Sequence, residues 1–176
     1  MNLWAGSTPR RLGPVAPGAA RPDSEDVLVL LGLASGAQLR ARLPLRGAGQ
    51  VLERLNNWSE PMIPLGTAAA AGGASASASL VVARAELAWM CAADPSPAVD
   101  KTAHARTVLA HVGSFEVRGT IQALHPLRWD DFLLARSVDG GFFALTDARI
   151  TSPHLSLATS LLAVNAARVA ALLALD

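Results

Sequence analysis

The feature that most constrains this chain of 176 residues is that two of its segments follow the same pattern. Each segment begins with an apolar run, a turn that contains glycine and a second apolar run. The runs are Val27–Leu33 and Leu39–Leu43 in the first unit, and Val108–Val112 and Phe115–Leu124 in the second. Apolar runs separated by a short glycine turn are typical of β-hairpins. The sequence therefore predicts one hairpin at the start of each unit.

The two units also keep the same spacing after the hairpin. When Arg40 is matched to Arg118, Leu55 falls on Leu133 without a gap. Both leucines lie in short segments that are compatible with a helix: Val51–Asn56 and Trp129–Ala135. We therefore expect the two units to share one order of elements and to superpose on each other.

Each unit continues with a short apolar segment, Met62–Leu65 or Phe142–Leu145, which we expect to be a strand. Each then ends with two apolar runs broken by a polar residue, Leu80 to Met90 and Leu161 to Leu173. This order of strands and one helical turn is found in small bent β-barrels, which remove the edges of a sheet by closing it. The expected fold class is mainly β, with two tandem small β-barrel-like repeats and short helical turns.

Proline and glycine divide the chain into four parts. Residues 1–22 form a Pro/Gly-rich tail, 23–93 the first small barrel, 94–104 a linker that starts at Asp94-Pro95-Ser96-Pro97, and 105–176 the second small barrel. Thr67–Ser79 is almost entirely Ala, Gly and Ser, a composition typical of flexible loops. Because each unit alone is too small to bury a large core, we expect the two to pack together.

Two phrases stand out in the second unit: Phe142–Ala148, which reads F-F-A-L-T-D-A, and Leu161–Asn165, which reads L-L-A-V-N. These phrases resemble the pattern of a bacterial family of uncharacterised small β proteins. The first unit keeps the Leu55-Asn56 pair of that family but lacks the full Thr-x-Ala phrase. The resemblance implies a small Sm-like or SH3-like barrel and no assigned chemistry.

The segment from Leu155 to Leu175 is long enough to raise the question of a membrane span, which needs about 20 mainly apolar residues. Arg168 and Asn165 lie inside it, and a central Arg is costly in a bilayer. We therefore favour two buried elements joined at Asn165. The amino terminus has no apolar stretch of the kind found in signal peptides, so we expect a cytoplasmic protein, with a peripheral place at the inner membrane as an alternative.

Residues that could carry chemistry are few and scattered. The four histidines show no metal-binding spacing, and His111 lies in an expected strand, where a hydrogen-bonded and partly buried imidazole is usual. Asp130-Asp131 is a tight carboxylate pair, and we interpret it as capping a short helix. Cys91 has apolar neighbours and no cation to activate it. We expect no catalytic residue, metal or cofactor, although an enzyme of unknown type remains an alternative.

The charge balance argues against nucleic acid, which Sm-like barrels often bind. The first unit, residues 23–92, has five basic against six acidic residues, and residues 93–176 have seven against eight. Recognition of RNA normally needs a basic surface with exposed aromatic side chains. We therefore do not expect nucleic acid as a partner, and an RNA-binding Sm-like barrel is an alternative function.

The tail carries the candidate binding residues: Leu3, Trp4, Arg10 and Arg11. A tryptophan in a Pro/Gly-rich tail has nothing local to pack on, so it could dock on its own barrel or anchor a partner. We expect Leu3 and Trp4 to enter an apolar pocket of a partner while Arg10 and Arg11 meet carboxylates or lipid phosphates at its rim. The sequence thus favours a non-catalytic accessory subunit that binds proteins of a larger assembly, for which an extrinsic place on a bacterial respiratory or photosynthetic membrane complex is one setting.

Overall fold

The computed structural model describes most of the two units and neither end of the chain. The described residues are 26–45, 50–70, 76–93, 104–123, 128–138 and 141–175. The proposed tail, residues 1–22, and nearly all of the proposed linker, 94–104, lie outside them. Over the described residues the chain is mainly β with short helical segments, so this part of the expected fold class is confirmed.

The first half of the molecule, residues 26–92, begins with a hairpin that turns through Gly36. The φ angle of Gly36 is +92°, in the left-handed region that other residues rarely adopt, so the glycine sets the place of this turn. The elements of the half are β1 (Asp26–Leu33), β2 (Gln38–Pro44), α1 (Val51–Asn56), β3 (Met62–Ala70), β4 (Ala76–Ala83), the 3₁₀ turn η1 (Arg84–Glu86) and β5 (Leu87–Ala92).

The second half, residues 104–175, runs through the same kinds of element in the same order. Its first hairpin turns through Gly113, which has a φ angle of +58°. In its second strand Phe115 and Val117 are buried while Glu116 and Arg118 are exposed, which is the alternation of a strand with one buried face. The elements are β6 (His104–Val112), β7 (Phe115–Ala123), α2 (Trp129–Val138), β8 (Phe142–Ser152), β9 (Leu155–Asn165), the 3₁₀ turn η2 (Ala166–Arg168) and β10 (Val169–Leu175).

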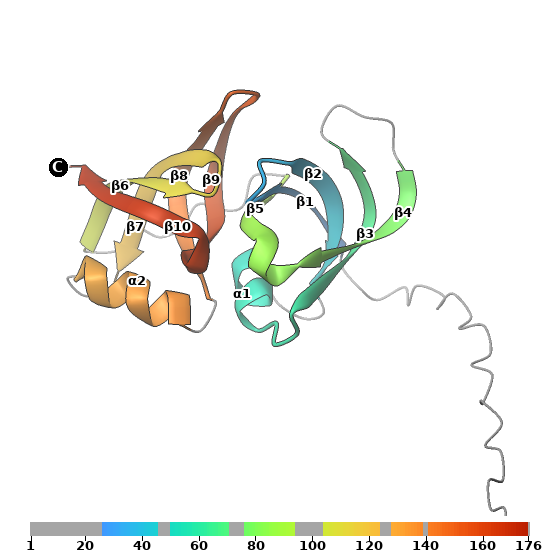
Figure 1. Ribbon diagram of the computed structural model, residues 1–176, viewed down its shortest axis with the longest axis horizontal. Helices are drawn as coiled ribbons and strands as arrows, with labels where there is room; N and C mark the ends of the chain where they lie inside the picture. Colours follow the sequence, from blue (N-terminus) through green and yellow to red (C-terminus); the bar gives the residue numbers. More distant parts are fainter. Residues whose placement is uncertain are drawn as a thin grey trace, which may run out of the picture.

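All ten strands belong to one antiparallel order, β10-β6-β7-β8-β9-β5-β1-β2-β3-β4. In each half the last strand pairs with the first, β5 with β1 and β10 with β6. A short β5–β9 ladder joins the halves, which lie side by side in Figure 1 with α1 and α2 on the same side of the molecule. The sheet is thus two strongly bent five-stranded parts with one connection.

The closed barrels expected from the sequence are not formed by the described residues. Closing the first half would need β5 to pair with β4, but the second side of β5 pairs with β9. Closing the second half would need β10 to pair with β9, whose free side is taken by β5. Because β5 and β9 pair with each other across the junction, neither strand can close its own half, and the sheet stays open and ends at β4 and β10.

The small-residue segment Thr67–Ser79 was expected to be a loop, and this expectation is wrong at both of its ends. Strand β3 continues to Ala70 and pairs with Leu39–Ala41 of β2, and β4 begins at Ala76. Sheet hydrogen bonds come from the backbone, so a run of alanine and serine can be a strand when a partner strand lies beside it. Residues 71–75 are outside the described part.

Each half encloses its own hydrophobic core. The first contains Val29, Leu31, Ala41, Leu43 and Leu55, which come from β1, β2 and α1. The second is built in the same way, with these β6, β7 and β8 residues among its members: Val108, Ala110, Phe115, Val117, Leu145 and Ile150. The elements between these two cores define the candidate site.

Candidate functional site: the junction between the two halves

The junction is the contact of β5 and η1 in the first half with β9 and η2 in the second. Its ladder is short: Trp89 pairs with Val164, and Met90 pairs with Ala163. Most of β5 is buried, although β5 lies at an end of the first half's own five strands. The second half therefore covers a strand that would otherwise be an open edge.

Side chains at the junction cross into the core of the opposite half. From β5, Ala88, Trp89 and Cys91 pack in the second core. In the other direction, Phe142 of β8 and Ala163 of β9 pack in the first core. Burying apolar side chains on both sides is the main stabilising term of such a contact.

Trp89 is the largest of these crossing side chains. It is 1% exposed and meets the ring of Phe115 edge to face, with 5.5 Å between ring centroids. Gly32 on the neighbouring β1 makes room for it, because a Cβ atom there would lie 2.2 Å from the indole Nε1. A glycine in a strand often marks such a close approach.

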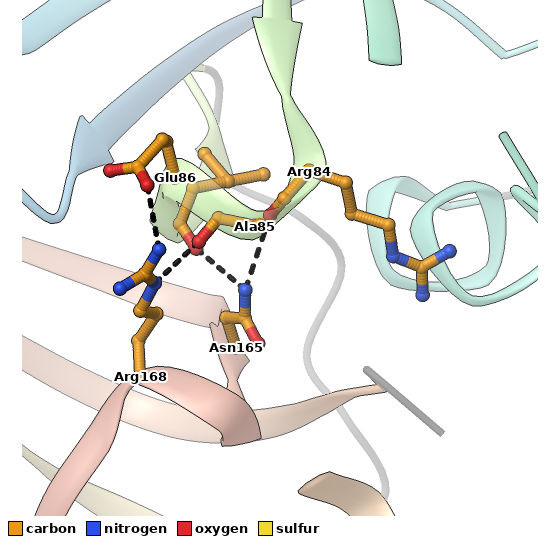
Figure 2. A network of polar contacts seen from close by, with 6 residues as sticks. Arg84, Ala85, Glu86, Asn165 and Arg168 are labelled. Carbon is orange, nitrogen blue, oxygen red and sulfur yellow. Dashed lines mark hydrogen bonds and ion pairs between the residues drawn. The ribbon is translucent and has the colours of Figure 1, made fainter. Parts of the chain in front are cut away.

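Asn165 is the buried polar residue of the junction, with 2% of its surface exposed. Its amide nitrogen donates to the backbone oxygen of Leu87 at 2.8 Å and to that of Arg84 at 3.3 Å, both in the first half. Its Oδ1 accepts a hydrogen bond from the backbone of Ala167 at 3.0 Å. Figure 2 shows this side chain reaching from the start of η2 towards η1. Asn165 therefore satisfies backbone groups of both 3₁₀ turns at once.

Arg168 forms the outer edge of the same network (Figure 2). Its Nη2 lies 2.7 Å from Oε1 of Glu86, and its Nε donates to the backbone oxygen of Ala85. The Arg168 and Glu86 side chains are 33% and 54% exposed, so the pair gains little from charge attraction in water. Its contribution is to orient η1 against η2.

A second polar contact crosses the junction at α1. The side chain of Asn56 donates to the backbone oxygen of Phe142 at 3.1 Å and accepts from its backbone nitrogen at 2.8 Å. Arg84 completes this side, with its guanidinium 5.5 Å from the centroid of the Phe142 ring. The first residue of β8 is thus held through both its backbone and its ring.

Cys91 is buried at the junction, as expected from its apolar neighbours. Burial raises the pKa of its thiol from 9.0 to about 11, while hydrogen bonds to Thr159 and to the backbone of Leu30 act weakly in the other direction. A thiol with this pKa stays protonated at neutral pH, and only the thiolate is a good nucleophile.

The other chemistry-bearing residues do not converge. Asp131 is exposed and forms an ion pair with Arg128 at 3.5 Å; the side chain of Asp130 lies outside the description. His111 is exposed on β6, so the expected partly buried imidazole is wrong. Within the described residues, no group of three or more His, Cys, Asp or Glu side chains is placed to hold a metal ion.

A surface hollow beside α1 is lined by Arg54 and Trp58 among others. The Arg54 guanidinium lies 3.9 Å from the centre of the Trp58 ring, and its Nε donates to the backbone oxygen of Pro44 at 3.0 Å. The indole nitrogen of Trp58 donates to the backbone oxygen of Met62 at 3.1 Å. These side chains join α1 to β2 and β3, so they stabilise the fold.

The structure and the sequence point to different residues. Leu3, Trp4, Arg10 and Arg11 lie outside the described residues, so their expected role stays a prediction. The sequence analysis used Asn165 only as a letter of a family phrase and as the joint between two elements expected to be buried, and it gave this residue no role in holding the two halves together. A single amide at the end of an apolar strand is the signal that could have marked Asn165 as a buried hydrogen-bonding residue.

Comparisons with models of protein families, with curated proteins and with solved structures found nothing that matches this chain. The resemblance to a family of small β proteins therefore stays a prediction from the sequence. Among the described residues, no helix has the length and apolar character needed to cross a membrane.

Proposed function

We propose that the protein is a non-catalytic structural subunit that binds other protein chains through the open edges of its sheet. One observation carries the proposal: β10 is an edge strand with the sequence V-A-A-L-L-A-L, and none of its seven residues is buried. Native proteins usually protect an edge with charges, proline or a covering element, because an exposed apolar edge pairs with other chains. An edge of this kind is typical of a strand that a partner covers.

We further propose that the two halves are copies of one small β unit. The halves share their element order, and the last strand pairs with the first in both. Arg40 lies across from Leu30, and Arg118 across from Leu109, at equivalent places of the two first hairpins. A duplicated unit explains how a contact used inside the chain can recur between chains.

The amino-terminal tail adds a second proposed contact, based on the sequence alone. Leu3 and Trp4 are proposed to anchor in an apolar pocket of a partner, and Arg10 and Arg11 to meet carboxylates or lipid phosphates beside it. Prolines limit the freedom that such a segment loses on docking, which favours binding. An extrinsic place on a bacterial membrane complex would suit this tail.

Placement of the described chemical groups supports binding better than catalysis. The Cys91 thiol is buried inside the junction, and the described acidic residues are on the surface. The residues with the strongest polar networks, Asn165 and Asn56, bind backbone groups of the opposite half. Their chemistry is that of holding one sheet against another.

The test is the size of the protein in extracts of the cells that naturally produce it. We expect the wild-type chain to migrate in a complex larger than one chain, with a fixed ratio of components by native mass spectrometry. Leu173→Lys, which places a charge on the β10 edge, should reduce the complex, whereas Thr151→Lys on the doubly paired strand β8 should not. Migration of the wild type as a single chain would contradict the proposal.

The tail has its own variant in the same extracts. Deleting residues 2–20 should weaken the complex and leave the two halves folded, as judged by an unchanged thermal unfolding transition. A truncated chain that assembles at the native ratio would show that the tail is not a tether.

A further inference from the structure

The junction inside the chain joins two different kinds of edge. It pairs β5, the last strand of the first half, with β9, the fourth strand of the second half. The two ends of the strand order are also a last strand and a fourth strand: β10 is the last strand of the second half, and β4 is the fourth strand of the first half. The molecule therefore ends in one edge of each kind that its own junction pairs.

The exposed apolar side chains of the described residues gather at the places that would complete such a pairing. The four large hydrophobic residues that are exposed are Met62 (44%), Val81 (53%), Leu134 (65%) and Leu173 (53%). Each has a counterpart, the residue at the same place in the other half, and each counterpart takes part in the junction.

Met62 and Val81 belong to the fourth-strand side of the first half. Met62 begins β3 as Phe142 begins β8. Val81 pairs with the third residue of β3, as Ala163 pairs with the third residue of β8. Phe142 and Ala163 are buried in the core of the opposite half. Met62 and Val81 are exposed, and among the described residues no half of the sheet pairs with β4 on its second side.

Leu173 and Leu134 belong to the last-strand side of the second half. Leu173 lies across from Leu109, as Cys91 lies across from Leu30, and Cys91 is buried in the opposite core. Leu134 is the sixth residue of α2, as Asn56 is the sixth residue of α1. Asn56 holds the backbone of Phe142, so a next half placed in the same way would bring Leu134 beside Met62.

The charges on the two 3₁₀ turns are compatible with the same arrangement. Glu86 is the third residue of η1, and Arg168 is the third residue of η2. At the junction, the acid Glu86 lies in the half that contributes its last strand, β5, and the base Arg168 lies in the half that contributes its fourth strand, β9. Between two chains the sides would be exchanged, which would place η2 of one chain beside η1 of the next. Arg168 and Glu86 already pair with each other inside each chain, so a contact between chains would have to share these two oppositely charged side chains.

We infer that the partner of these edges is a second copy of this chain, bound head to tail, with β10 of one copy paired to β4 of the next. This inference rests on the proposed function and names its partner. By analogy with the pairing of Met90 and Ala163, Leu172 lies across from Val81 of the next copy. Head-to-tail contacts close into a ring or continue as a filament, according to the rotation between copies.

The first test uses the purified full-length chain alone, in sedimentation velocity and light scattering over a wide range of concentration. We expect species whose mass is a multiple of 18.2 kDa and whose proportion rises with concentration. Val81→Lys and Leu173→Lys should each shift the mass to that of one chain, while Thr151→Lys should behave as the wild type. The far-ultraviolet circular dichroism of each variant shows whether it is folded.

A second test reads the register and does not depend on charged variants. Two chains that carry Cys91→Ala are mixed, one with Val81→Cys and the other with Leu172→Cys, and are mildly oxidised. Directly opposed residues of antiparallel strands are close enough for a thiol cross-link, so a disulfide-linked dimer should form. Leu175→Cys in place of Leu172→Cys moves the thiol out of register and should give much less dimer.

The outcomes separate this inference from the proposed function. The head-to-tail contact is overturned if the purified wild-type chain stays at 18.2 kDa and the Val81→Cys and Leu172→Cys chains give no more cross-linked dimer than the Leu175→Cys control. If that chain is still found in a larger complex in cell extracts, the proposed function holds and the partner is another protein. If it is a single chain in both settings, both proposals fail.

Discussion

Strands β5 and β10 hold the same place in their halves and differ sharply in burial. Their sequences are similarly apolar, L-A-W-M-C-A for β5 and V-A-A-L-L-A-L for β10. Five of the six residues of β5 are buried, whereas every residue of β10 is at least partly exposed. Each strand pairs with the first strand of its half, and β5 alone has a second neighbour.

The comparison shows that hydrophobicity by itself does not bury a strand. A strand at the end of a sheet becomes buried when another sheet pairs with its free side and packs on its side chains. At β5 this is achieved by β9 within the same chain. How much this covering contributes to stability can be measured by changing matched residues of the two strands and of the junction.

The largest difference should come from removing one large side chain from each strand. Trp89→Ala deletes a buried ring that contacts Phe115 and should lower the free energy of unfolding by about 3–5 kcal/mol. Leu173→Ala removes an exposed side chain and should change it by less than about 0.5 kcal/mol in dilute protein. Urea unfolding measures both values. Similar losses for the two variants would show that the large side chains of β5 and β10 contribute equally to stability in spite of their different burial.

Asn165 should come next, because its loss leaves backbone oxygens of the first half without a donor. Asn165→Ala is expected to lower the free energy of unfolding by about 2–3 kcal/mol. Asn57→Ala, which changes an exposed amide beside α1, is the matched control and should cost much less. Chemical denaturation compares the two, and a loss no larger than the control would mean that the junction does not depend on this network.

The buried thiol of Cys91 predicts a dependence on alkaline pH. Its pKa is about 11 in the folded chain and 9.0 without burial, so the folded state favours the protonated form. The resulting stability is complete below pH 9 and is lost as the pH rises to about 11, a decrease of about 2 kcal/mol. The chain has no Tyr, so few other groups titrate in this window. Cys91→Ala should lack the decrease; a parallel decrease in this variant would assign it to another group.

The smallest effect should belong to the exposed ion pair of Glu86 and Arg168. A double-mutant cycle with Glu86→Gln and Arg168→Gln should give a coupling energy of about 0.2–1 kcal/mol, reduced by salt. Thermal unfolding of the four proteins provides the measurement. A coupling well above this range would mean that the pair does more than orient the two 3₁₀ turns.

Local features of the fold could be predicted from the sequence because they depend on residues that are neighbours in the chain. The hairpin turns lie where Gly36 and Gly113 occur, since both need left-handed backbone angles. The helix expected over Val51–Asn56 has the same bounds in the structure, and α2 starts at Trp129 as expected. The alternation of apolar and polar residues along β7 also sorts its side chains into buried and exposed faces.

Features that depend on contacts between distant segments could not be predicted from local sequence patterns. The extension of β3 to Ala70 needs β2 as a partner, and small side chains carry no signal for it. The contact of Asn56 with the backbone of Phe142 joins residues 86 positions apart, so no local pattern marks it. The candidate tail residues came from composition and were not placed by the described structure.

Local sequence is enough to place the hairpin turns, to give the strands their apolar faces and to show that two similar segments follow one another. These properties come from local backbone preferences and from the period of the side chains, which each segment carries alone. The packing of whole segments is what leaves the sheet open over the described residues, covers β5 and places β4 and β10 at the two ends of the strand order. Which edges pair depends on how two whole halves fit together, and the apolar sequences of β5 and β10 are too alike to tell a covered strand from an uncovered one.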